Sequence, residues 1–226
     1  MIQCLVCMKL KVMKKNLFIL VIAMITTLTA GAQLDFSNIR VDVGANYTMY
    51  KGDFQQKTPG AKVRVSLLAN EKIAVGLGFT YGFPIKIPTT VTYTGGGTVP
   101  SEVIYNFKTI SLDVNYYFGG EKEEGFSVYG AGGAGLVLVG FKEKIKGTAP
   151  AGQEPQDQLE PGTETGFSIN LGLGGQYALG NAKIFADAGI ALPANQVNGQ
   201  YVENVIPAHF IFNIGVRFSF GSRSDY

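Results

Sequence analysis

Period-two alternation of apolar with small or polar side chains recurs in eight segments of this chain, and it constrains the fold more than any other feature. Successive side chains of a β-strand point to opposite faces, so each segment predicts a strand with one apolar face and one wet face. No window beyond the N-terminal stretch has an amphipathic helical period. The predicted strands cover residues 39–50, 61–68, 73–83, a segment ending at 118, 126–141, 167–179, 183–192 and 210–220.

Segment 126–141 changes alternation phase along its length. Two adjacent glycines, Gly132 and Gly133, lie where the phase changes. Because a β-bulge shifts the alternation by one residue and glycine permits its backbone angles, we expect a bulge at this pair.

Connections between the predicted strands alternate strictly between short and long. Short periplasmic turns and long extracellular loops are typical of a transmembrane β-barrel. A soluble β-domain is the competing fold, but it provides no reason for this alternation. We therefore predict an all-β, eight-stranded antiparallel up-and-down transmembrane barrel with both termini in the periplasm. The short connections are 69–72, 119–124 and 180–182, and the long ones are 51–60, 84–100, 142–164 and 193–207.

The N-terminal 32 residues have the three parts of a secretory signal peptide. Lys14 and Lys15 are the basic region, residues 17–28 the apolar region, and residues 30–32, Ala-Gly-Ala, the small-residue cleavage site. A transmembrane anchor is the alternative, but the apolar run is too short for one. The sequence predicts a start at Met13, cleavage near Gln33, a barrel over 33–220 and a periplasmic tail over 221–226.

Removing the signal peptide changes which functions the composition allows. Four of the 19 basic residues lie in it, which leaves 15 basic and 17 acidic residues. This net charge of −2 gives no basic surface for nucleic acid. Cys4 and Cys7 precede Met13, so a mature chain has neither a disulfide nor a catalytic thiol.

The last predicted strand, 210–220, resembles the C-terminal sorting signal of the small outer-membrane β-barrel proteins of Gram-negative bacteria. The matching positions are Asn213, Gly215, Phe218 and Phe220. The tail after Phe220 departs from that pattern, which usually ends the chain at its last aromatic residue. The resemblance implies an integral outer-membrane protein that contacts outer-membrane lipids and is folded by the barrel assembly machinery.

Aromatic side chains in this register fall on the outward face near both ends of the barrel. Two such belts are expected at the two lipid–water interfaces. The predicted loop-end belt is Tyr81, Phe83, Phe167, Phe210 and Phe212, and the predicted turn-end belt is Tyr116, Phe118, Phe126, Tyr177, Phe218 and Phe220.

Five charged residues point inward in this register: Asp42, Arg64, Asp113, Asp187 and Arg217. An eight-stranded barrel is filled by side chains, and buried charges must pair. We expect Asp42 to pair with Arg64 and Arg217, and Arg217 also to neighbour Asp187. The hypothesis is a structural ion-pair network in the turn-side half that blocks water passage. An ion-conducting or substrate-binding lumen is the functional alternative.

Three patterns suggest catalysis or ligand binding, and none is specific. Residues 130–135 match the dinucleotide spacing G-x-G-x-x-G, but a strand follows instead of the required helix. His209 lacks a nucleophile and an orienting carboxylate nearby in sequence, so we expect a solvated rim histidine. The carboxylates of 142–164 follow no calcium-loop signature. The sequence predicts no catalytic residue, cofactor or metal site.

The sequence therefore predicts a non-enzymatic outer-membrane scaffold whose extracellular loops mediate surface interaction or support envelope integrity. Binding would occur on loops 51–60, 84–100, 142–164 and 193–207, where Val91 and Tyr93 share one alternation phase that can extend a strand above the membrane. The alternatives are a narrow pore or carrier for small or hydrophobic solutes and, third, a lipid-modifying enzyme.

Overall fold

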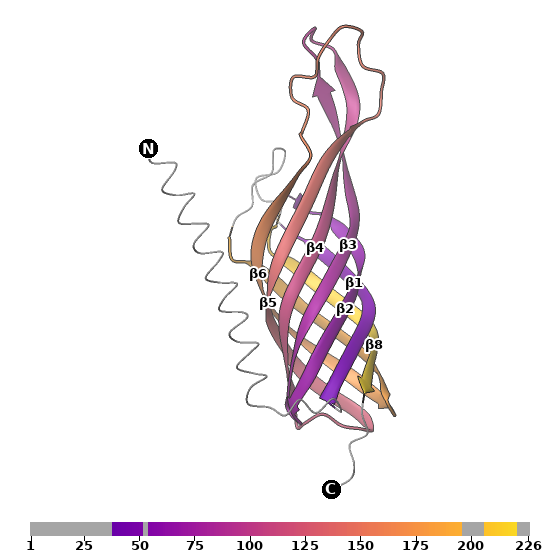
Figure 1. The fold of residues 1–226 in the computed structure, drawn as a ribbon, viewed down its shortest axis with the longest axis vertical. Coiled ribbons are helices and arrows are strands. Elements are labelled where there is room, and N and C mark those ends of the chain that lie inside the picture. Colours follow the sequence, from indigo (N-terminus) through magenta and orange to yellow (C-terminus); the bar gives the residue numbers. More distant parts are fainter. Residues whose placement is uncertain (1–37, 52–53, 196–205, 221–226) are drawn as a thin grey trace, which may run out of the picture. The chain divides into compact units, whose positions relative to one another are not determined.

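In the computed structural model, which describes residues 38–51, 54–195 and 206–220, eight strands form a closed antiparallel barrel (Figure 1). Each strand pairs with the next along the chain, and the last closes against the first. The chain separates into two units, Met1–Ser37 and Asn38–Tyr226, and the barrel lies in the second. The strands are β1 (Ile39–Tyr50), β2 (Lys57–Asn70), β3 (Ile73–Thr92), β4 (Thr98–Phe118), β5 (Gly125–Ile145), β6 (Gly162–Leu179), β7 (Ala182–Pro193) and β8 (His209–Phe220).

The predicted all-β, eight-stranded up-and-down fold is confirmed. The predicted signal peptide over 1–32 and the tail over 221–226 lie outside the described residues. Within the described ranges, no helix is long and apolar enough to cross a membrane.

The two ends of the barrel differ in their connections. The β2–β3, β4–β5 and β6–β7 connections are short and define what we call the turn end. The other connections define the loop end. The β1–β8 seam relates the two, because Ile39 pairs with Phe220 at the turn end and Tyr50 pairs with His209 at the loop end.

Side chains divide between the two faces in the opposite way to a soluble protein. Large apolar residues such as Leu173 and Ile214 are exposed on the outer surface, while charged residues such as Asp42 and Arg217 are buried in the lumen. This arrangement is expected for a barrel surrounded by lipid. Of the predicted belt residues, Tyr81 is half-buried and the others are exposed on the outer surface.

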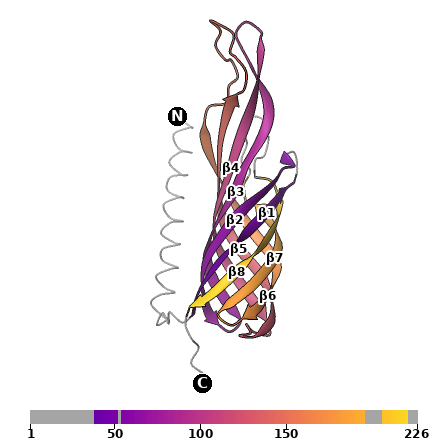
Figure 2. The same cartoon turned by 90° about the vertical axis from the view of Figure 1, so that its right-hand side faces the viewer.

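Three strands extend beyond the barrel at the loop end (Figures 1 and 2). Pairing of β2 with β3 ends at Gly60 and Gly82, and pairing of β5 with β6 ends at Phe141 and Gly162. Beyond these pairs, β3, β4 and β5 continue as a three-stranded sheet that we call the projection.

The prediction of long loops over 84–100 and 142–164 is therefore partly wrong. Most of 84–100 is strand, with only 93–97 between β3 and β4, and β5 continues to Ile145. Alternation alone did not extend these strands because the chain leaves the membrane band there and its outward residues become polar. The loop 51–60 is also shorter than predicted because β2 begins at Lys57, and most of 193–207 lies outside the described residues.

The predicted bulge at Gly132 and Gly133 is wrong. β5 pairs without a register shift with both neighbours through these residues, and its odd-numbered side chains face inward along its whole length. The apparent phase change arises because Val137 and Val139 are apolar but point inward. The register shift occurs in β3 instead, between Gly82 and Ile85, where Pro84 cannot donate a ladder hydrogen bond.

Candidate functional site in the barrel lumen

Asp42 on β1 lies between two arginines from the neighbouring strands β2 and β8. Arg64 donates through Nε to Asp42 Oδ2 over 2.7 Å, and Arg217 donates through Nε to Oδ1 over 2.7 Å. The side chains of Asp42 and Arg217 are only 2% and 1% exposed. Register explains the contact, because Asp42 is the cross-strand partner of both arginines.

Arg217 is held by further groups from β4, β5, β6 and β7. Its Nη1 donates to the Tyr117 hydroxyl over 2.6 Å and to the Gln176 side-chain carbonyl. Its guanidinium also lies 5.6 Å from the Tyr129 ring centroid and 5.3 Å from that of Phe185. One arginine therefore contacts strands from opposite walls, which fills the lumen at this height.

A second charged layer lies closer to the turn end, and the sequence analysis missed it. Glu121, in the β4–β5 turn, forms ion pairs with Arg40 on β1 and with Lys183 on β7, the latter over 2.8 Å. Gln176 Nε2 donates to the same carboxylate over 2.8 Å. The inward alternation phase of Arg40 and Lys183 was available in the sequence. Nothing in the sequence indicated that Glu121 alone among the turn acids points inward.

The remaining two predicted carboxylates lie nearer to the middle of the lumen. Asp113 Oδ2 lies 3.3 Å from Lys62 Nζ and 3.9 Å from Arg64 Nη1. Asp187 accepts a 3.3 Å hydrogen bond from the Tyr129 hydroxyl and a 2.5 Å hydrogen bond from Asn213 Nδ2. These contacts join both carboxylates to the surrounding strands.

The expected pairing of Arg217 with Asp187 is wrong. The two strands are neighbours as predicted, but Arg217 pairs in register with Lys183, and Asp187 pairs with Asn213. Period-two counting identifies the face on which a residue lies and leaves the stagger between neighbouring strands open, and a barrel requires such a stagger.

Two small polar cavities lie above the arginines. One has a volume of about 60 Å³ and is lined by residues that include Lys62, Asp113 and Asp187. The other, of about 50 Å³, lies closer to the loop end and is lined by residues that include Thr80, Ser168 and His209. Such volumes suit a few water molecules.

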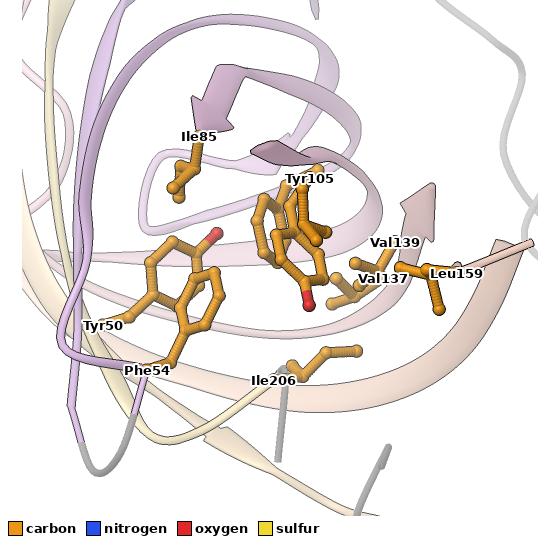
Figure 3. Close-up of a cluster of buried hydrophobic side chains, with 10 residues drawn as sticks. Tyr50, Phe54, Ile85, Tyr105, Val137, Val139, Leu159 and Ile206 are labelled. Carbon is orange, nitrogen blue, oxygen red and sulfur yellow. The ribbon is translucent and has the colours of Figure 1, made fainter. Parts of the chain in front are cut away.

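An apolar plug closes the lumen at the loop end (Figure 3). Three of its members come from the loop-end connections: Phe54, Leu159 and Ile206. Aromatic rings pack at its centre, with centroids 4.8 Å apart for Tyr50 and Phe107. The plug consists of Tyr50, Phe54, Ile85, Val103, Tyr105, Phe107, Val137, Val139, Leu159 and Ile206.

His209 lies beneath the plug and is not the solvated rim histidine that the sequence predicted. It is 9% exposed, its Nδ1 lies 2.9 Å from the Pro207 carbonyl oxygen, and its ring centroid lies 5.0 Å from that of Tyr50. The physical reason is its odd position in β8, which points it into the lumen, where the plug covers it.

The four residues of the predicted sorting signal lie on both faces of β8. Asn213 faces the lumen and accepts a 2.8 Å hydrogen bond from Asn46. Gly215 faces the lumen at the seam opposite Gly44. Phe218 and Phe220 are exposed on the outer surface. Their role in sorting stays a prediction.

The patterns considered for catalysis and ligand binding have structural roles here. The glycines of 130–135 lie inside β5 and pair with β4 and β6. Among the described residues, no group of histidine and acidic side chains is arranged to hold a metal ion.

A sequence model of the outer membrane protein beta-barrel domain matches residues 18–220. The chain belongs to this family. Membership makes the protein an integral barrel of the bacterial outer membrane with a porin-like fold. No curated protein matches the sequence.

Solved structures of outer-membrane barrels share this fold. Neisserial surface protein A is 16% identical, with 80% of this chain and 97% of that chain covered and a TM-score of 0.53. Ail of Yersinia pestis is 14% identical, with 80% and 99% covered and a TM-score of 0.45. A major outer membrane protein of Thermus thermophilus is 15% identical, with 80% and 98% covered and a TM-score of 0.45.

Proposed function

We propose that this protein is a non-enzymatic, non-conducting outer-membrane barrel that carries the projection on a rigid scaffold for surface interaction or envelope integrity. The observation that carries the proposal is the closure of the lumen at two heights. Arg217 fills the cross-section toward the turn end, and the apolar plug fills it at the loop end.

The cavities between the two closures support the same conclusion. Their volumes of about 60 and 50 Å³ hold water molecules and leave no room for a sugar or a lipid chain. Ion passage would require both the charged network and the plug to open at once. A narrow pore or carrier for small or hydrophobic solutes is therefore the less favoured function.

The proposed orientation places the turn end in the periplasm and the loop end outside the cell. Short turns and long loops support this assignment. Four regions then face the exterior, at 51–60, 84–100, 142–164 and 193–207, and the projection provides most of the surface available to a ligand. The residues Asn213, Gly215, Phe218 and Phe220 would present the finished strand to the barrel assembly machinery.

The projection is built as a folded element, which supports a role in recognition. Segment 153–157 pairs with the end of β3, where Thr94 N donates to the Glu154 carbonyl over 3.1 Å and Gln156 N to the Thr92 carbonyl over 2.9 Å. Beneath this loop, Val91, Tyr93 and Val99 are buried together. A surface held in one conformation loses little entropy on binding.

Planar-bilayer recording of the refolded protein tests the closed lumen. We expect no steady conductance from protein whose heat-modifiable gel mobility shows that it is folded. Steady open-channel current, or swelling of loaded liposomes in small sugars, would instead establish the pore. Lipid A mass spectra from cells with and without the protein test the enzyme alternative, and we expect identical spectra.

A trimmed variant tests the role of the projection. Replacing 84–105 and 142–161 with short turns removes the projection, and we expect the barrel to fold. Surface interaction predicts that adhesion or ligand capture falls while detergent resistance of the cells is unchanged. Envelope support by the barrel predicts that deleting the whole protein lowers detergent resistance and that the trimmed variant restores it. Neither effect would contradict the proposal.

A further inference from the structure

Five consecutive strands carry an outward-facing lysine at the loop-end limit of the apolar surface. All five lysines are exposed. The Lys51 ammonium also lies 5.0 Å from the Phe210 ring centroid, against the aromatic belt. We call this set the lysine half-ring, and it consists of Lys51 after β1, Lys57 of β2, Lys86 of β3, Lys108 of β4 and Lys142 of β5.

The height of the half-ring follows from β4. Outward residues from Phe118 to Ile110 are apolar and exposed, and Lys108 is the next outward residue. Ten residues at about 3.4 Å each, tilted by about 40°, rise about 26 Å, which matches the apolar band of an outer-membrane barrel. Lys108 therefore lies at the lipid–water interface, and Lys86 and Lys142, which flank Ile104, lie farther out.

Further lysines extend this positive face along the projection. Lys146 Nζ lies 2.8 Å from Glu102 Oε2, and Lys144 is the cross-strand partner of Glu102. The hydrogen bond from Lys146 lowers the pKa of Glu102, and the charges of Lys86 and Lys144 lower it further. Beyond Lys108, Glu102 is the single acidic residue among the outward positions of β3, β4 and β5, so positive charge predominates.

The turn end lacks such a surface. Its exposed charged residues in the connections are Lys72 and Lys122 against Glu71, Glu123 and Glu124. The two membrane interfaces of the described barrel therefore differ in charge, with lysines on one side and a slight acidic excess on the other.

We propose that the lysine half-ring binds the phosphate groups of an anionic glycolipid in the leaflet at the loop end. The lysines lie where the lipid phosphates of that leaflet lie. Ammonium groups bind phosphate oxygens as point charges, without the fixed geometry of a guanidinium. Free inorganic phosphate would not also gain from the apolar surface directly below the half-ring, where acyl chains pack.

Binding of purified lipid A to the folded full-length protein in detergent micelles tests the proposal, with native mass spectrometry to count bound lipid. The test variant is Lys86→Gln/Lys142→Gln. The matched control is Lys72→Gln/Lys122→Gln, which removes the same charge from the turn end. Each lysine near a charged membrane surface contributes about fivefold to binding, so we expect about thirtyfold weaker binding for the test variant. The control variant should bind as the wild type does, and enzymatically dephosphorylated lipid A should bind weakly to all three proteins.

Three results would overturn the proposal. They are equal affinity of the two variants, equal affinity for dephosphorylated lipid A, and displacement of lipid A by equimolar inorganic phosphate or phosphatidylglycerol. Heat-modifiable mobility shows that each variant is folded. Binding at this outer face does not depend on whether the lumen conducts, so its failure is distinguishable from failure of the proposed closed barrel.

Discussion

Replacing Asp42 by asparagine removes the single negative charge shared by Arg64 and Arg217 and keeps the shape of the side chain. The two arginines form four contacts of 2.5 to 3.0 Å with this carboxylate. Without it, two buried cations lie side by side with only neutral partners and the more distant Asp113. Breaking a buried ion pair by removing one partner costs about 3–5 kcal/mol.

We expect a loss of about 3 kcal/mol for Asp42→Asn, at the lower end of that range. Arg217 keeps its hydrogen bond to Tyr117, and Arg64 keeps a 3.2 Å hydrogen bond to Asn115, which offsets part of the cost. The free energy of unfolding is measured by urea titration of protein refolded into short-chain phospholipid vesicles, with unfolding and refolding curves compared for reversibility.

The matched control is Glu102→Gln in the projection. Glu102 also pairs with a cation, but its partner Lys146 is 49% exposed, and exposed pairs contribute little. If Asp42→Asn loses no more stability than this control, the buried network does not stabilise the barrel as argued. A double-mutant cycle with Arg217→Gln adds a second criterion, because the two losses should be less than additive by about 1 kcal/mol or more.

Three further substitutions have matched expectations. Glu121→Gln leaves Arg40 and Lys183 buried without their carboxylate and should cost about 3 kcal/mol in the same titration, while Glu124→Gln in the same turn should be neutral; equal effects would contradict the inserted position of Glu121. Gly189→Ala places a Cβ 2.5 Å from the Leu171 carbonyl oxygen and should cost about 1–3 kcal/mol, whereas Gly132→Ala, with its nearest neighbour at 3.8 Å, should be tolerated. Pro88→Thr restores an N–H on the free edge of β3, where Thr92 N and O bond the covering loop, so we expect dimers or larger species in size-exclusion chromatography with light scattering. A monomer indistinguishable from the wild type would show that Pro88 does not guard this edge.

The face of each residue could be predicted from the sequence because it depends only on position within a strand. Asp42, Arg64 and Arg217 were assigned to the lumen by alternation, and their strands were known to be neighbours once eight strands close into a ring. Phe218 and Phe220 were assigned to the outer surface in the same way. These conclusions require no knowledge of contacts distant in sequence.

Contacts across the lumen could not be predicted, because they depend on stagger and height. Asp187 meets Asn213 instead of Arg217 since β7 and β8 are offset, and Arg217 reaches Tyr117 on the far wall. Alternation also could not distinguish an apolar side chain facing lipid from one facing the plug. Val137 and Val139 therefore suggested a bulge that does not exist.

The sequence by itself determined that the chain forms an eight-stranded barrel for a lipid environment, because strand alternation and connection length are local properties. Only the tertiary structure decided how the lumen closes. The polar network needs Glu121 from a turn, and the plug needs Phe54, Leu159 and Ile206 from three separate connections. Their positions follow from packing against strands far away in the chain, and local sequence does not encode that packing.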